Sequence, residues 1–185
     1  MIEVKKKILV IAFALVFMAF MVAPVMAEPA TKIEGVTLTL ATTLIPDPDS
    51  AIFADHNIVH YEGIAIGAAT LDIPGQGSLS FTYDGVWSGS SKWTNPPNPD
   101  PDATNVIRST VVLTCTDEGI TGTFEGMLHG KTIGLPPPPL PGAVTSYIEY
   151  HMVFHGTGDF QGQTLKLSYA GAPPVEFEGT LIMPK

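Results

Sequence analysis

The sequence has little cysteine and little positive charge: one cysteine and nine lysine or arginine residues among 185. A single cysteine excludes a disulfide framework and any cysteine-rich metal or cluster site. Charged residues make up only 15% of the chain, whereas hydrophobic residues make up 45%. This composition can build a packed core, so it excludes a chain that is disordered throughout. The length suits a single domain.

The N-terminal segment has the pattern of an export signal. Lys5, Lys6 and Lys7 precede an uninterrupted apolar stretch that runs from Ile8 to Ala23, and Pro24 then ends it. Residues 25–27, Val-Met-Ala, supply the small residues that signal peptidase reads. Residues 1–27 are therefore predicted to be a signal peptide. The alternative is an uncleaved membrane anchor over residues 8–26, because the apolar stretch is slightly longer than usual.

Either alternative places residues 28–185 outside the cytoplasm, secreted or extracytoplasmic. Removal of residues 1–27 takes away three lysines and one glutamate, which changes the formal net charge from −9 to −11. Such an acidic surface repels phosphate backbones and anionic lipid headgroups. We therefore expect no nucleic-acid partner, and membrane contact only through residues 8–26 if they remain attached. Solubility alone is also a sufficient explanation for the acidic composition.

The mature chain has the periodicity of β-strands. After Pro29, apolar and polar residues alternate in short segments bounded by Gly, Pro, Asn and Asp, and no segment has the pattern of a long amphipathic helix. Eight strands are predicted, centred on residues 36–44, 58–68, 79–83, 107–115, 120–128, 148–154, 165–169 and 175–183. Proline-rich loops near 88–105 and 134–143 interrupt them, because proline cannot enter a sheet ladder.

Eight strands without a helix leave two architectures, a β-sandwich or a closed antiparallel β-barrel. An aromatic-Glu-Gly triplet occurs at residues 61–63, 124–126 and 177–179. Glycine on the same face as a core aromatic residue lets a strand coil sharply, as closure of a small barrel requires. The triplets therefore favour a single eight-stranded antiparallel barrel over residues 28–185.

Residues 156–162 read Gly-Thr-Gly-Asp-Phe-Gln-Gly, and a strand and a closing Phe-Glu-Gly-Thr-Leu segment at 177–181 follow. This arrangement resembles the C-terminal part of allene oxide cyclase-like and dirigent-like barrels, over about the last quarter of the chain. The resemblance implies an eight-stranded antiparallel barrel with a pocket at one mouth. Plant members of that group steer reactive, largely apolar molecules by confinement. None of their functional residues maps onto a matching position here, so the resemblance implies the fold and not the activity.

The histidines and the two acidic loops lack the spacing and the ligand sets of metal sites. His56 and His60, like His151 and His155, are four residues apart, which on a strand spans roughly 13 Å and is too far for one ion. His151 and His155 share a polar face with Glu149, which indicates a solvated strand face. Pro-Asp-Pro-Asp at 46–49 and 99–102 lacks the further ligands of a calcium loop. We expect no metal ion and no cofactor.

The second predicted strand has two faces that are both partly apolar. If Ile64 and Ile66 point into the barrel, His60 and Glu62 on the same face point inward too. A buried ionisable pair of this kind would be the best candidate site in the chain. Alternatively, a bulge at Gly63 switches the phase and returns His60 and Glu62 to solvent. The sequence leaves both alternatives open.

Two functions remain, and neither assigns a catalytic residue, since no Gly-x-Ser-x-Gly elbow is present. The first is a non-catalytic binding module for a small apolar ligand or a cell-envelope partner. The second is a cyclase or isomerase that acts by confinement, with His60 and Glu62 as its polar groups. The ligand-binding candidates are His60, Glu62, Tyr83 and Trp93, and Trp87 is either a second anchor or a core residue. An interior cavity above roughly 300 Å³ that holds His60 or Glu62 would favour the enzyme.

Overall fold

The computed structural model describes residues 30–47, 52–54, 57–92, 103–134, 145–172 and 175–185, and no α-helix occurs in these ranges. Within these ranges, nine strands form one antiparallel sheet. They are β1 (Thr31–Pro46), β2 (Ile52–Ala54), β3 (Ile58–Ile73), β4 (Gly77–Lys92), β5 (Thr104–Cys115), β6 (Thr123–Gly134), β7 (Thr145–Gly156), β8 (Thr164–Gly171) and β9 (Glu176–Met183). A single turn of 3-10 helix, η2 (Gly158–Phe160), lies between β7 and β8.

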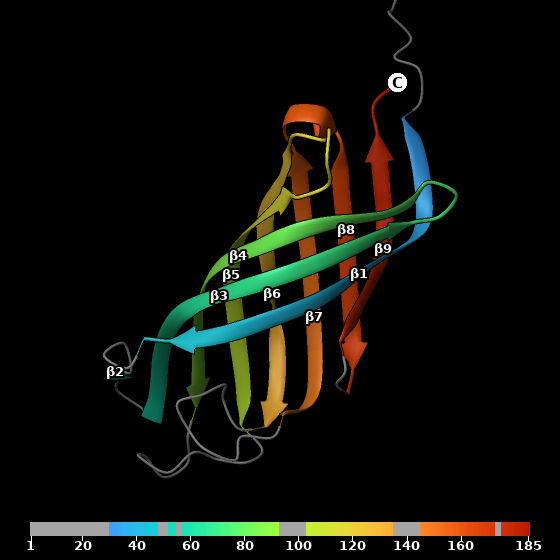
Figure 1. Ribbon diagram of the computed structural model, residues 1–185. Coiled ribbons are helices and arrows are strands. Elements are labelled where there is room, and N and C mark those ends of the chain that lie inside the picture. Colours follow the sequence, from blue (N-terminus) through green and yellow to red (C-terminus); the bar gives the residue numbers. More distant parts are fainter. Residues whose placement is uncertain (1–29, 48–51, 55–56, 93–102, 135–144, 173–174) are drawn as a thin grey trace, which may run out of the picture.

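The sheet closes into an eight-stranded barrel. The strand order is β1-β9-β8-β7-β6-β5-β4-β3, and a further pairing of β1 with β3 joins the two ends. β1, β3 and β4 cross in front of the other strands in Figure 1, and the short β2 pairs only with the start of β3. The predicted closed antiparallel barrel is therefore confirmed, and the sandwich alternative is wrong. Each of the eight predicted strand segments overlaps one barrel strand.

The boundaries differ from the prediction at residues 120–122 and 175, which precede β6 and β9, and most clearly at the first proline-rich loop. β4 continues to Lys92 and β5 begins at Thr104, so residues 88–92 are strand rather than loop. Ser88, for example, pairs with both Glu62 and Arg108. The rest of that loop, the second proline-rich loop and the N-terminal segment lie outside the described residues. Within the described part of the chain, no helix has the length and hydrophobicity needed to span a membrane.

The glycines of the three triplets lie where neighbouring strands come closest. A Cβ atom on Gly126 would lie 2.0 Å from the carbonyl oxygen of Val153, and one on Gly179 would lie 1.8 Å from that of Lys166. On Gly63 it would lie 2.5 Å from the Trp87 ring. No side chain fits at these distances, so the strands can coil there only because glycine is present. A Cβ atom on Gly67 or Gly130, which are not in the triplets, would lie as close to a neighbouring carbonyl oxygen, at 2.2 Å and 1.9 Å.

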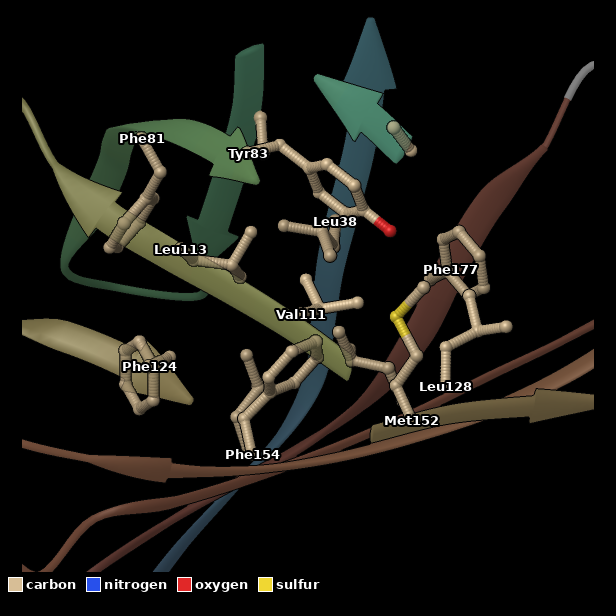
Figure 2. Packing of buried hydrophobic residues seen from close by; sticks show 14 of the residues in the cluster. Leu38, Phe81, Tyr83, Val111, Leu113, Phe124, Leu128, Met152, Phe154 and Phe177 are labelled. Atoms are coloured by element: carbon tan, nitrogen blue, oxygen red, sulfur yellow. The ribbon is translucent and has the colours of Figure 1, made fainter. Parts of the chain in front are cut away.

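Large side chains fill one end of the barrel, which we call the packed end. The rings of Phe124 and Phe160 stack with their centroids 4.7 Å apart, and Phe81 lies 5.8 Å from Phe160. Leu113 and Phe154 are fully buried beside them, and Figure 2 shows Phe81, Leu113, Phe124 and Phe154 gathered in the interior from four different strands. Burial of such residues supplies most of the stabilising free energy of a small barrel.

A cavity at the other end of the barrel

A cavity of about 730 Å³ occupies the other end of the barrel, which we call the hollow end. Residues of seven strands, and Val175 just before β9, line this cavity. The lining residues are Thr39, Leu40, Ala41, Thr42, Thr43, Leu44, Ala65, Tyr83, Trp87, Ile107, Ser109, Leu128, Thr132, Ile148, Tyr150, Val175 and Phe177. Most are aliphatic or aromatic, and the polar members are mainly hydroxyls. The volume lies within the range of roughly 300–1,000 Å³ that is typical of small-molecule sites.

The cavity exists because inward positions at this end carry small residues. On β4 the inward residues that line the cavity are Tyr83 and Trp87, with the buried Gly85 between them. On the neighbouring strands, Ala65 and Ser109 also point inward and are too short to fill the interior. Interior positions of small barrels are filled by side chains only when those side chains are long enough to meet. Small residues on adjacent strands therefore leave the space open.

Four aromatic side chains form flat walls around this space. The Tyr83 ring extends from β4 toward Phe177 of β9 (Figure 2). Tyr150 lies parallel to Phe177, with ring centroids 6.4 Å apart and planes 14° apart. Trp87 is buried and meets Tyr61 edge to face at 5.7 Å. Such surfaces favour apolar, and especially flat, ligands.

The interior of the cavity is electrically neutral. No charged side chain lines it among the residues that the structure describes. Burial raises the pKa of Tyr83 to about 12, against a smaller opposing effect of the Ser109 hydroxyl. Burial also raises the pKa of Tyr150 to about 12, and the nearby Tyr83 phenol adds to that shift. Both phenols therefore stay protonated at neutral pH and can donate hydrogen bonds.

A buried polar network flanks the cavity and is well satisfied. Asn105 is fully buried, and its side-chain amide donates to the Gly134 carbonyl at 3.0 Å and to Thr132 Oγ1 at 3.2 Å. Its Oδ1 accepts a hydrogen bond from the Tyr61 hydroxyl at 3.3 Å. Because buried polar groups are costly without partners, this network fixes the ends of β5 and β6 beside the cavity.

The indole nitrogen of Trp87 differs from this network. The Trp87 side chain lines the cavity and is only 4% exposed, yet its Nε1 has no hydrogen-bond partner among the residues that the structure describes. An indole N–H can only donate. A buried donor without an acceptor costs about 1–3 kcal/mol. Ser91 Oγ, farther along β4, is a second buried polar atom without a partner among the described residues.

The structure places His60 and Glu62 on the outer face of the barrel, not inside it. The alternative that exposes His60 and Glu62 therefore agrees with the structure, but β3 pairs with β4 without interruption from Ile58 to Ile73, so the bulge at Gly63 that it invoked is wrong. Ile64 and Ile66 point outward as well, with 43% and 41% of their surfaces exposed. The inward face of β3 is the other one, with Tyr61 and Gly63.

His60 and Glu62 border a second hollow of about 540 Å³, together with Asp47, Arg108 and neighbouring serines. None of its lining residues lines the larger cavity. His151 and His155 are exposed on the outer face, as predicted. Across the described ranges, no group of three or more His, Cys, Asp or Glu side chains is placed to hold a metal ion.

Of the other sequence-derived candidates, Tyr83 lines the cavity and Trp93 lies outside the described residues. Tyr150 and Ser109 also line the cavity and are not among the sequence-derived candidates, although their alternation with Met152 and Val111 places both on inward faces. The sequence allows Trp87 to be either a ligand-binding anchor or a core residue. In the structure Trp87 is buried and also lines the cavity.

Comparisons of the chain with protein-family models, with curated proteins and with solved structures found no match. The resemblance to allene oxide cyclase-like and dirigent-like barrels therefore stays a prediction. The cavity and its lining residues are therefore the features that bear on function.

Proposed function

We propose that this protein is a non-catalytic binding module that takes a small, largely apolar molecule into the hollow end of its barrel. The cavity of about 730 Å³, with its aliphatic and aromatic walls, is the observation that carries the proposal. Burial of apolar ligand surface against such walls supplies binding free energy without any charged group. The export signal predicted in residues 1–27 would place this binding outside the cytoplasm.

The alternative, a cyclase or isomerase that works by confinement, receives less support. It depended on His60 or Glu62 inside the barrel, and both side chains point outward. Phenols with raised pKa values are poor proton acceptors at neutral pH. Recognition of a cell-envelope partner would rely on residues 93–102 and 135–144, which lie outside the described residues. Ligand binding is therefore the function that the cavity itself favours.

Binding can be tested with N-phenyl-1-naphthylamine, an uncharged dye whose fluorescence rises in apolar surroundings. We expect saturable binding to the purified protein. Ala65 is 4% exposed and lines the cavity, so Ala65→Leu should fill space that the dye needs and weaken binding at least about tenfold, which corresponds to about 1.4 kcal/mol.

Ala69→Leu is the matched control, because Ala69 lies on the same face of β3 but does not line the cavity. This variant should lose about 1–3 kcal/mol of stability through overpacking and still bind the dye. Circular dichroism would establish that both variants are folded. Equal affinity of the wild-type protein and Ala65→Leu would contradict the proposal.

A further inference from the structure

We infer that the molecule taken into the hollow end is a short extended peptide with apolar side chains, which pairs with a free edge of β1 as an additional strand. This inference rests on the proposed function and adds the chemical class of the ligand. Three features support it: an unpaired strand edge beside the cavity, an uncharged sequence along that edge, and an apolar space that side chains of the added strand can enter.

The first feature is the place where β1 loses one of its two neighbours. β9 pairs with β1 only as far as Thr39, whereas β3 pairs with β1 as far as Pro46. Residues 41–46 therefore have a strand on one side only, as far as the structure describes the chain. The cavity lies along this edge, because the six consecutive residues 39–44 all line it although their side chains alternate between the two faces of the sheet.

The backbone groups of Thr42 and Leu44 point to the free side of β1. The Asp47 N–H donates to the Glu62 carbonyl of β3 at 2.9 Å, and in an antiparallel ladder every second residue makes such bonds. Residues 41, 43 and 45 therefore bond to β3, whereas Thr42 and Leu44 face the side that β9 does not reach. Their two N–H and two C=O groups have no strand partner among the described residues. Leu44 is also 42% exposed, so solvent reaches this edge.

The second feature is that this edge is not protected against pairing. An exposed strand edge is a template for another chain, and proteins usually guard it with charged residues, proline or a bulge. Residues 36–45 contain no charged residue and no proline, and Pro46 comes only at the end of β1. The pairing of β1 with β3 has no register shift. The edge can therefore accept a strand.

The third feature is the space beside the edge. Thr42 and Leu44 continue the inward face that begins with the buried Val36 and Leu38. Residues of an added strand that lie opposite them direct their side chains to the same face, into the cavity of about 730 Å³. The described lining residues carry no charge, so apolar side chains fit there at the lowest cost. A second copy of the chain offers the same edge, but its inward side chains would point into its own barrel and leave both cavities unfilled.

This mode of recognition combines main-chain hydrogen bonds with pockets for alternate side chains. It is tested with the capped peptide acetyl-Leu-Thr-Leu-Thr-Leu-amide and two N-methylated isomers of it. With its leucines in the cavity, the peptide points its leucine amides to β1 and its threonine amides to solvent. Methylation of the central leucine amide therefore removes a hydrogen bond to β1, whereas methylation of the adjacent threonine amide removes none.

Affinities are measured by displacement of N-phenyl-1-naphthylamine from the wild-type protein. We expect the leucine-methylated isomer to bind at least about tenfold more weakly than the threonine-methylated one, as the loss of a hydrogen bond at a site closed to water predicts. The two isomers have the same composition, so each is the control for the apolarity of the other. Equal affinities would overturn strand pairing.

Amide hydrogen exchange, followed by nuclear magnetic resonance, gives a measurement on the wild-type protein. In the free protein, the Thr42 and Leu44 amides should exchange faster than those of Ala41 and Thr43, which bond to β3. Saturating peptide should slow Thr42 and Leu44 at least about tenfold and change Ala41 and Thr43 much less. Unslowed exchange would overturn the inference. Slow exchange in the free protein that depends on protein concentration would overturn it too, because a second copy would then occupy the edge.

The result can be separated from that of the proposed function. If N-phenyl-1-naphthylamine does not bind in a manner that Ala65→Leu weakens, the proposed function itself fails. If the dye binds in that manner, but the peptide neither displaces it nor slows the exchange of Thr42 and Leu44, only the assignment of a peptide ligand fails.

Discussion

The two ends of the barrel are built from the same strands but differ in what those strands place inside. At the packed end, Phe81 and Phe124 meet Phe160 in a continuous ring cluster. At the hollow end, Ala65 and Ser109 occupy equivalent inward positions and leave a cavity. The hydrogen-bonded sheet runs through both ends. One sheet can thus concentrate its packing at one end and keep a binding space at the other.

The largest expected effect compares two leucines. Leu113 is fully buried at the packed end, whereas Leu128 lines the cavity with 6% of its surface exposed. Leu113→Ala should cost about 3–5 kcal/mol, since it removes a side chain that is packed on all sides. Leu128→Ala should cost about 1–2 kcal/mol less, because Leu128 already borders open space. Urea unfolding measures both, and equal losses would contradict the division into two ends.

The next effect concerns how the hollow end is held together. The Asn105 amide there joins Thr132, Gly134 and Tyr61 through buried hydrogen bonds. Asn105→Ala leaves these groups without partners and should cost about 2–4 kcal/mol, whereas Thr132→Val removes a single partner and should cost about 1 kcal/mol. Chemical denaturation measures both variants. A neutral Asn105→Ala would show that the network contributes little to this end.

The closed barrel could be predicted because alternation along each strand and the inward glycines are local features of the sequence. It was harder to predict which face of β3 points into the barrel, because alternation identifies the inner face only where the outer face is polar. Ile64 pairs with Ile45 on one side and Val86 on the other, and all three are exposed. In the sequence, this exposed row of apolar residues has the same pattern as a face that points into the core. The competing pattern, Tyr61 and Gly63 on one face, was the correct guide.

The cavity could not be predicted in the same way. Whether a barrel interior is filled depends on the stagger between strands, because the stagger decides which side chains lie at the same height along the barrel axis. Trp87 on β4 and Tyr150 on β7 reach one space only because of that stagger. The sequence does carry a partial signal in Ala65 and Ser109, two small residues that alternate with larger inward residues of their strands.

The smallest expected effect is a pH dependence that belongs to the hollow end. Burial raises the pKa of Tyr83 to about 12, whereas a tyrosine in the unfolded chain titrates near about 10. Below about pH 10 both states keep the proton, so the contribution to stability is fully present. Between about pH 10 and 12 the unfolded chain releases it first, so stability falls as the pH rises, by up to about 2 kcal/mol. The phenylalanine rings of the packed end do not titrate. Tyr150 contributes to the same fall, because burial also raises its pKa to about 12. Tyr83→Phe should therefore reduce, but not abolish, the fall seen in urea unfolding across this window, and unchanged slopes would place the alkaline sensitivity elsewhere.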